Sequence, residues 1–297
     1  MDPGRERYVL ATNSRHGEGE VSRMFSGTRL RLATVAVTAL ATVGIAAGCG
    51  GSNDTSTGET IAVGSDIPYP PFEQGKNPPY TGFDVDLVNA VADKLGKKAE
   101  FQNTSFDTIF RDLAQGKFDM VASATTITVE RLGEVQFTQP YIDADQSLMV
   151  KKGSPIKSTS DLSGTTVGAQ TGTTGAAYAE DKTDATVRTY GKIDDAFNAL
   201  EAGQVDAVIN DFPVSAFATK SHTDLEVVQT IPTGEKYGFA FPKESDLFSD
   251  FNNALSEIKK DGTYAKVFQK WFNQPPPKSI LSDTQVPTEN TPGLPKK

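Results

Sequence analysis

Residues Leu113-Ala-Gln-Gly116-Lys-Phe-Asp119-Met-Val121 recur further along the chain as Leu200-Glu-Ala-Gly203-Gln-Val-Asp206-Ala-Val208. In each copy a helical segment ends at a glycine, and an apolar run with an aspartate at its start follows. Glycine often ends helices because it adopts the left-handed conformation at little cost. The repetition therefore predicts that the chain holds two similar α/β lobes.

Strand and helix signals also alternate around the first copy. Ile61-Ala-Val63 is a short apolar run, and a helical pattern runs from Asp84, the expected N-cap, to Gly96. A second helical pattern begins at Phe106, and residues 118–122 have the composition of a buried strand. Strands that alternate with helices predict an α/β fold with parallel strands.

The two repeated strands lead into residues 123–128 and 210–213. Ligands of open α/β folds bind beyond the carboxyl ends of the strands. Two lobes whose carboxyl edges face each other would form a cleft, so these two segments are the first candidates for a binding site.

The N-terminal part of the chain has the pattern of a secretory signal. Residues 24–31 are basic, and residues 32–47 are uncharged and rich in Ala, Val and Leu. The pattern predicts a signal peptide over residues 1–48, with Met24 as the true start and residues 1–23 untranslated. The alternative is an uncleaved membrane anchor.

Cys49, the only cysteine of the chain, directly follows the small residues that end this segment. Such an arrangement resembles the bacterial lipobox, and the resemblance implies that Cys49 is lipidated, with palmitate among the acyl chains. Ala46 departs from this pattern, because a leucine usually stands there. Residues 49–59 are expected to form a flexible linker because Gly, Ser, Asn, Asp and Thr dominate them.

Composition excludes several classes of function. The formal net charge is −9, which argues against nucleic acid as a partner. A single cysteine excludes an internal disulfide, and His222, the only histidine outside the predicted signal peptide, lies in a polar segment that predicts an exposed loop. We expect no metal, no cofactor and no catalytic residues. Gly172-Thr-Thr-Gly175 predicts a strand-to-helix turn that could hold a small anion such as a carboxylate.

Several separated segments together resemble the periplasmic amino-acid-binding proteins of polar amino acid ABC importers, solute-binding family 3. The resemblance covers residues 58–274. It is specific because the segments agree in order and spacing, whereas each one is weak by itself. The segments are Gly64-Ser-Asp-Ile-Pro-Tyr-Pro-Pro-Phe-Glu73, Gly82-Phe-Asp-Val-Asp-Leu87, Ser123-Ala-Thr-Thr-Ile-Thr-Val-Glu-Arg131, Phe137-Thr-Gln-Pro-Tyr141, Gln170-Thr-Gly-Thr-Thr174, Asn210-Asp211, and Asp261-Gly-Thr-Tyr264 with Trp271-Phe272.

This resemblance implies the type II periplasmic-binding-protein fold, in which each lobe is a mixed sheet flanked by helices and two hinge strands join the lobes. Lobe 1 would comprise residues 58–143 and 237–274, and lobe 2 residues 147–232. Residues 275–297 are rich in proline and polar side chains, so a disordered tail is expected there.

The resemblance also implies roles for individual residues. Arg131 would bind the ligand α-carboxylate, for which its planar guanidinium is suited; the alternative is a surface arginine in the first turn of a helix. Asp211 would bind the α-ammonium, or cap a helix that begins at Phe212, or both. Further hydrogen bonds to the zwitterion would come from Ser123, Ala124, Thr126, Thr173 and Thr174.

The side-chain end of the ligand would lie between Tyr69 and Phe106, although Phe106 also fits the apolar stripe of a core helix. Asp66 would face the far end of the ligand, and a carboxylate there favours a cation. Gln170 occupies a position that is lysine in some glutamine-specific relatives. Its neutral side chain therefore favours arginine, lysine, ornithine or histidine as the ligand, with glutamine as the alternative.

These features predict the substrate-binding component of an ABC importer. It would be a monomer that delivers a free amino acid to a permease, from a lipid anchor on the outer face of the bacterial membrane or on a membrane that faces the periplasm. The alternative is a cyclohexadienyl dehydratase-like enzyme, since some relatives catalyse that reaction. No acid stands out in the sequence for that chemistry, so we expect a binding protein and no enzyme.

Overall fold

The structure, a computed structural model, describes residues 59–297. All of them belong to one compact unit, residues 55–297. The predicted signal peptide, its start at Met24 and the lipidation of Cys49 lie outside the described residues. None of the helices in the described part is long and apolar enough to cross a membrane.

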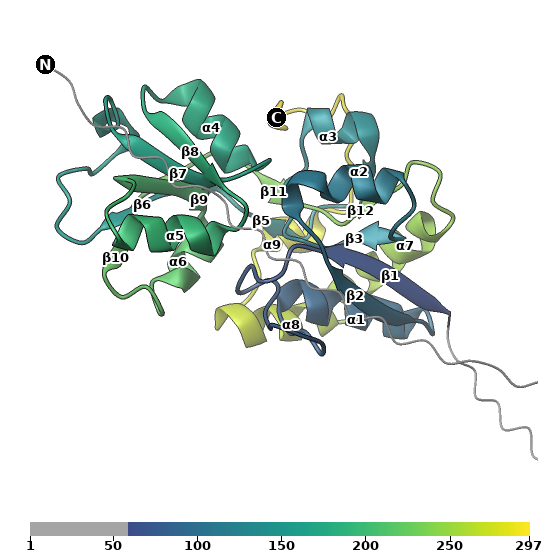
Figure 1. The fold of residues 1–297 in the computed structure, drawn as a ribbon. Coiled ribbons are helices and arrows are strands. Elements are labelled where there is room, and N and C mark those ends of the chain that lie inside the picture. The colour runs from purple at the N-terminus through teal and green to yellow at the C-terminus, as the bar shows by residue number, and fades with distance from the viewer. Residues whose placement is uncertain (1–58) are drawn as a thin grey trace, which may run out of the picture. The chain divides into compact units, whose positions relative to one another are not determined.

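The first sheet has five strands in the order β2-β1-β3-β12-β4 (Figure 1). The pairs β1–β2 and β1–β3 are parallel, and β12 is antiparallel to both β3 and β4, so the sheet is mixed. The strands are β1 (Thr60–Ser65), β2 (Lys98–Asn103), β3 (Met120–Val121), β4 (Gln136–Phe137) and β12 (Ala240–Phe241). The helices are α1 (Phe83–Lys94), η1 (Phe106–Thr108), α2 (Ile109–Ala114), α3 (Val129–Glu134), α7 (Leu247–Lys260) and α8 (Thr263–Phe272).

The second sheet also has five strands, in the order β10-β6-β9-β7-β8. Strand β7 is parallel to β8 and β9, whereas β6 is antiparallel to β9 and β10. The strands are β6 (Gln146–Lys151), β7 (Thr166–Gln170), β8 (Thr186–Tyr190), β9 (Ala207–Asp211) and β10 (Leu225–Ile231). The helical segments are η2 (Thr159–Asp161), α4 (Thr174–Lys182), α5 (Ile193–Glu201) and α6 (Phe212–Ala218).

Two short strands carry the chain between the sheets. Strand β5 (Ile142–Asp143) precedes β6, and β11 (Lys236–Tyr237) follows β10. They pair antiparallel with each other, and Figure 1 shows them between the two sheets. We call the first sheet with its helices lobe 1 and the second sheet with its helices lobe 2. The predicted architecture of two mixed sheets joined by two hinge strands is confirmed.

The repeated motif performs the same structural task in both lobes. The Asp119 carboxylate accepts a hydrogen bond of 2.7 Å from the Ala62 backbone N–H of β1. The Asp206 carboxylate accepts one of 2.8 Å from the Thr166 backbone N–H of β7. Each aspartate thus ties the start of one central strand to its parallel neighbour. The prediction of two similar lobes is confirmed.

Aromatic packing attaches the C-terminal helix α8 to the first helix of lobe 1. The Phe83 ring of α1 lies with its centroid 5.0 Å from that of Phe272 and 5.7 Å from that of Phe268. Phe83 and Phe268 belong to the hydrophobic core, and the partly buried Phe272 packs against it. Burial of such large apolar surfaces is a main source of stability in a chain without a disulfide.

Two local predictions are wrong. Helix α1 begins at Phe83 after Gly82, and the side chain of Asp84 makes no capping bond; it is buried instead in the core. His222 is also buried, at 9% exposure, because its ring lies 3.2 Å from Asp194 and 3.1 Å from Glu201 on neighbouring helix α5. Its polar sequence neighbours gave no sign of these tertiary contacts.

The structure also differs from the disorder expected for residues 275–297. Helix α9 (Lys278–Ser282) forms after the proline run and buries the side chain of Ile280. The Lys259 ammonium group of α7 donates a hydrogen bond of 2.9 Å to the Asp283 carbonyl. Composition predicts disorder because proline and polar residues bury little surface, but one apolar anchor and a few backbone contacts fix this segment onto lobe 1.

Candidate functional site

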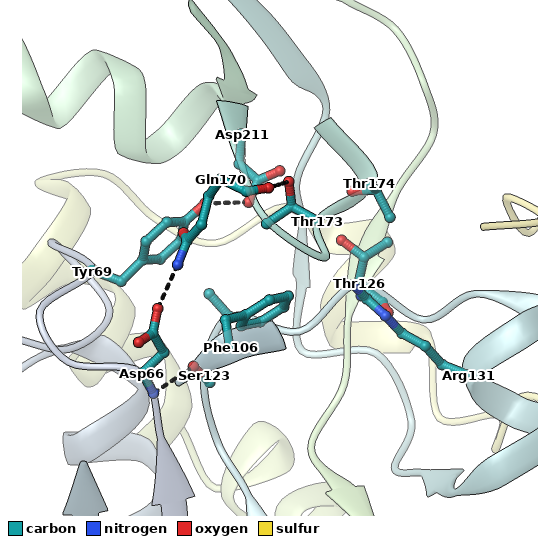
Figure 2. A pocket seen from close by; sticks show the side chains of 11 residues that line it. Asp66, Tyr69, Phe106, Ser123, Thr126, Arg131, Gln170, Thr173, Thr174 and Asp211 are labelled. Carbon is teal, nitrogen blue, oxygen red and sulfur yellow. Dashed lines mark hydrogen bonds between the residues drawn. The ribbon is translucent and has the colours of Figure 1, made fainter. Parts of the chain in front are cut away.

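All eleven residues that the sequence predicts for ligand binding line a single pocket between the two lobes (Figure 2). The cavity that they enclose is narrow in this structure, about 10 Å³. These residues are Asp66, Tyr69, Phe106, Ser123, Ala124, Thr126, Arg131, Gln170, Thr173, Thr174 and Asp211.

The pocket forms where the carboxyl ends of the parallel strands meet. Asp66 follows β1, and Ser123 and Ala124 follow β3, all in lobe 1. Gln170 ends β7 and Asp211 ends β9 in lobe 2. The topology therefore places the two predicted edges opposite each other, as expected for an open α/β fold.

Arg131 contacts both lobes through its guanidinium group. It lies in the first turn of α3 and donates hydrogen bonds of 2.8 Å to the Thr126 carbonyl of lobe 1 and 3.1 Å to the Gly172 carbonyl of lobe 2. The guanidinium carbon also lies 5.4 Å from the ring centroid of Phe106 and 4.9 Å from that of Phe110. Phe106 is at the same time part of the apolar cluster around α2, so it packs in the core as its apolar stripe predicts and also lines the pocket.

Arg131 remains a cation at neutral pH. Burial lowers its pKa to about 10, against the opposing effect of the negative charges on Glu235 and Asp211. A cation with a planar fork in the lining of the pocket is suited to hold a carboxylate.

Asp211 is surrounded by donors. Its carboxylate accepts hydrogen bonds of 2.5 Å each from the Tyr69 hydroxyl, the Tyr237 hydroxyl and the Gln146 amide. Burial raises its pKa, although these donors act in the opposite direction. Asp211 stands at the N-cap position of α6, but its side chain makes no capping bond, so the capping alternative is wrong. Its carboxylate lies in the lining of the pocket.

Glu235 is a second buried acid that sequence analysis missed. Its Oε2 accepts hydrogen bonds from the hydroxyls of Thr126 (3.0 Å) and Thr174 (2.7 Å), one from each lobe. Burial raises the pKa of Glu235, and the nearby charge of Asp211 raises it further. The two threonines predicted to bind a ligand thus already hold a carboxylate of the protein itself.

The predicted acid at the far end of the pocket, Asp66, is paired. Gln170 donates a hydrogen bond of 2.6 Å to its Oδ2, and the Lys192 ammonium forms an ion pair with its Oδ1. Lys192 directly precedes α5 in lobe 2. Burial raises the pKa of Asp66, while Lys192 and Gln170 both act to lower it.

Backbone geometry shapes the floor of the pocket. Ser123 accepts a hydrogen bond of 2.9 Å from the Asp66 backbone N–H. Ala124 adopts a φ of 46°, in the left-handed region, and its N–H donates to Asp84. On the opposite side Thr173 caps α4 by accepting from the Ala176 N–H, as the predicted strand-to-helix turn requires.

Three residues near the pocket lie at positions without a local sequence motif: Lys192, Glu235 and Gln146. Lys192 and Glu235 lie in connecting segments and Gln146 in a strand, and their proximity depends on how the lobes pack. No signal in the sequence singles them out. Within residues 59–297, no group of three or more His, Cys, Asp or Glu side chains could hold a metal ion.

The lining of the pocket combines a cation, Arg131, with two buried acids, Asp211 and Asp66. A further buried acid, Glu235, is hydrogen-bonded to the lining residues Thr126 and Thr174. Such a distribution suits a small zwitterion with a polar side chain. Charges of opposite sign are needed there because unpaired ions in a closed site cost several kcal/mol each, roughly.

Comparisons with known proteins agree with this geometry. The model of the bacterial extracellular solute-binding proteins, family 3, matches residues 61–274. ABC transporter arginine-binding protein 1 of Escherichia coli (strain K12) is 34% identical over 227 residues, which cover 74% of this chain and 93% of that protein. ABC transporter glutamine-binding protein GlnH of Bacillus subtilis (strain 168) is 36% identical over 201 residues, 66% of this chain and 74% of that protein.

A solved structure is also similar. The arginine-, lysine-, histidine-binding protein ArtJ from Geobacillus stearothermophilus has a TM-score of 0.71 and 35% sequence identity, over 75% of this chain and 99% of ArtJ. The matched region contains both sheets, apart from Thr60 of β1, and every residue of the pocket. The chain therefore belongs to the bacterial extracellular solute-binding proteins of family 3.

Proposed function

We propose that this chain is the substrate-binding component of an ABC importer and captures a free basic L-amino acid in the pocket between its lobes. The ligand would be arginine, lysine, ornithine or histidine. Arg131 holds its α-carboxylate, Asp211 its α-ammonium, and Asp66 with Tyr69 and Phe106 its side chain.

The observation that carries this proposal is the convergence of all eleven predicted residues on one pocket that both lobes line. A ligand held by Arg131 from lobe 1 and Asp211 from lobe 2 links the lobes. Its binding shifts the population toward the closed form, because only that form allows both contacts. The closed form then docks on the permease.

The test is calorimetry with arginine, lysine, ornithine and histidine. Replacing Arg131 by Ala removes a charged hydrogen-bonding partner, and we expect the dissociation constant to rise at least about 30-fold. Arg111→Ala is the matched control, since Arg111 is an exposed arginine of α2 outside the pocket. Equal affinity of Arg131→Ala and wild type would overturn the assignment.

Glutamine is the second candidate ligand, and the Asp66–Lys192 ion pair favours it. This pair supplies the positive charge that Gln170 lacks, so the far end of the pocket carries less net negative charge than the sequence suggests. A thermal-shift screen over the standard amino acids and ornithine separates the candidates, because a bound ligand raises the melting temperature by mass action.

We propose binding without catalysis. The residues that surround Asp211 satisfy its carboxylate, and Glu235 is hydrogen-bonded by two threonines, so neither acid is placed for proton transfer to a leaving group. Incubation with prephenate or arogenate tests this point, since turnover of either compound would show an enzyme.

We also propose that the protein is exported and anchored to a membrane. The pattern of residues 1–48 supports secretion, and Cys49 would carry the lipid that holds the protein at the outer face of a membrane. Labelling with a radioactive fatty acid should mark wild type and fail to mark Cys49→Ala. We expect the mature chain to be a monomer, and light scattering would reveal any other state.

A further inference from the structure

Both oxygens of the Asp66 carboxylate in lobe 1 are engaged by lobe 2. Gln170 donates a hydrogen bond to Oδ2, and the Lys192 ammonium pairs with Oδ1. The same ammonium donates a hydrogen bond of 3.0 Å to the Ile67 carbonyl, also in lobe 1. Lys192 therefore lies at the end of the pocket where the side chain of the proposed ligand would bind.

The environment of this pair differs from that of a surface salt bridge. The side chain of Asp66 is 2% exposed, and that of Lys192 is 32% exposed. Exposed pairs contribute little because water screens both charges. A buried carboxylate depends much more on its partner, because a charge without one is costly in the interior.

We infer that Lys192 is a specificity-determining residue, a cation of the protein itself that competes with a basic ligand side chain for Asp66. This inference rests on the proposed function. Lys192 would thereby set the ratio of affinities for basic amino acids and for a neutral amide such as glutamine.

The chemistry of the two ligand classes differs at this point. A guanidinium or ammonium group can pair with Asp66 only if Lys192 withdraws, since two cations on one carboxylate repel each other. Withdrawal is possible because Lys192 is partly exposed and its ammonium sits on a flexible four-carbon stem. A carboxamide needs no withdrawal, because its N–H groups can donate to Asp66 and its oxygen can accept from Lys192.

A purely structural role makes a different prediction. If Lys192 served only to hold the lobes together, its loss would weaken the closed form and reduce the affinity for every ligand by the same factor. The ratio of affinities for arginine and glutamine therefore distinguishes a role of Lys192 in ligand selectivity from a role in holding the lobes closed.

The experiment measures the dissociation constants of arginine and glutamine by calorimetry for wild type, Lys192→Met and Lys192→Arg. Met keeps the length of the stem and removes the charge, and Arg keeps the charge. We expect Lys192→Met to change the ratio at least about tenfold in favour of arginine, and Lys192→Arg to keep a ratio close to that of wild type. Lys94→Met is the control, because Lys94 forms its ion pairs with Glu257 and Asp261 on the surface of lobe 1.

An unchanged ratio in Lys192→Met, or one that moves toward glutamine, would overturn the inference while leaving the proposed function intact. If wild type binds neither arginine, glutamine nor any other amino acid, the proposed function itself fails and the inference fails with it. Circular dichroism of each variant establishes that it is folded before binding is compared.

Discussion

The Asp84 carboxylate accepts a hydrogen bond of 3.0 Å from the backbone N–H of Ala124. Asp84 lies in the first turn of α1, whereas Ala124 lies in the pocket with a φ of 46°. A left-handed conformation costs a residue other than glycine roughly 1–2 kcal/mol. The buried acid thus helps to hold a strained backbone in the lining of the pocket.

Replacing Asp84 by Ala should therefore affect both stability and binding. The change leaves the Ala124 N–H and the Tyr141 hydroxyl, which donates to the same oxygen at 2.7 Å, without an acceptor. Unsatisfied buried groups cost about 1–3 kcal/mol each, so for two groups we expect a loss of about 2–6 kcal/mol in the free energy of unfolding. Asp84→Asn keeps an acceptor and should retain most of both properties. Urea unfolding and calorimetry measure them, and equal behaviour of the two variants would contradict this role.

The stability of the protein should depend on pH through Glu73 and Asp84. Both acids are buried side by side, and burial raises the pKa of Glu73 well above its ordinary value and that of Asp84 from 3.8 to about 6. The folded protein then holds protons that the unfolded chain releases. The contribution of these acids to stability is therefore largest below about pH 4 and is lost as the pH rises toward neutrality.

Glu73→Gln removes one of these titrations. We expect the variant to be more stable than wild type by on the order of 2 kcal/mol at about pH 8, and to differ little from it at about pH 4. Urea unfolding at several pH values measures the effect. A stability difference that stays constant with pH would show that the pKa of Glu73 is not raised in the folded protein.

Binding of the amino acid should release protons. Asp211 and Glu235 have raised pKa values because both are buried, and Arg131 is the cation nearby. An α-ammonium group adds a second positive charge and lowers the pKa of both acids. Since the free protein holds protons that the complex does not, the affinity should fall as the pH is lowered from neutrality.

Calorimetry in buffers of different ionisation enthalpy detects the released protons directly. Glu235→Gln has one acid fewer, so it should release fewer protons than wild type when both are measured at the same mildly acidic pH. Proton uptake on binding, or an identical release by both proteins, would contradict the assignment of the ammonium to Asp211, next to Glu235.

Sequence patterns could predict the fold because each signal reports a local structure that recurs. The glycine and aspartate of the repeat mark the end of a helix and the start of a strand in both lobes, and Asp119 and Asp206 indeed accept equivalent backbone hydrogen bonds. The pocket residues could be predicted because they follow these strands or belong to segments with the family pattern.

Other features could not be predicted, because they depend on contacts between distant segments. The position of Lys192 beside Asp66 depends on how lobe 2 packs against lobe 1. Glu235 directly precedes the hinge strand β11, and the course of this strand places it beside Thr126 and Thr174. Asp84 has the sequence position of a helix cap, but the buried groups around it determine its role.

The hydroxyl of Tyr69 joins the two lobes inside the pocket. It donates a hydrogen bond of 2.5 Å to the Asp211 carboxylate of lobe 2 and lies 3.0 Å from the Asn210 side-chain oxygen. Hydrogen bonds to charged groups contribute about 1.5–3 kcal/mol. Tyr69→Phe should therefore weaken amino acid binding at least about tenfold, and small-angle scattering of the ligand-free variant should show a larger radius of gyration.

Tyr237→Phe is the matched control, because Tyr237 donates to the same oxygen of Asp211 at the same distance of 2.5 Å. Tyr237 belongs to the hinge strand β11 and is not part of the pocket lining. Loss of its hydroxyl should destabilise the folded protein while leaving the lobes joined through Tyr69. If Tyr237→Phe weakened binding as much as Tyr69→Phe, the hydrogen bond between the lobes would have no special role, and both tyrosines would act only by holding Asp211 in place.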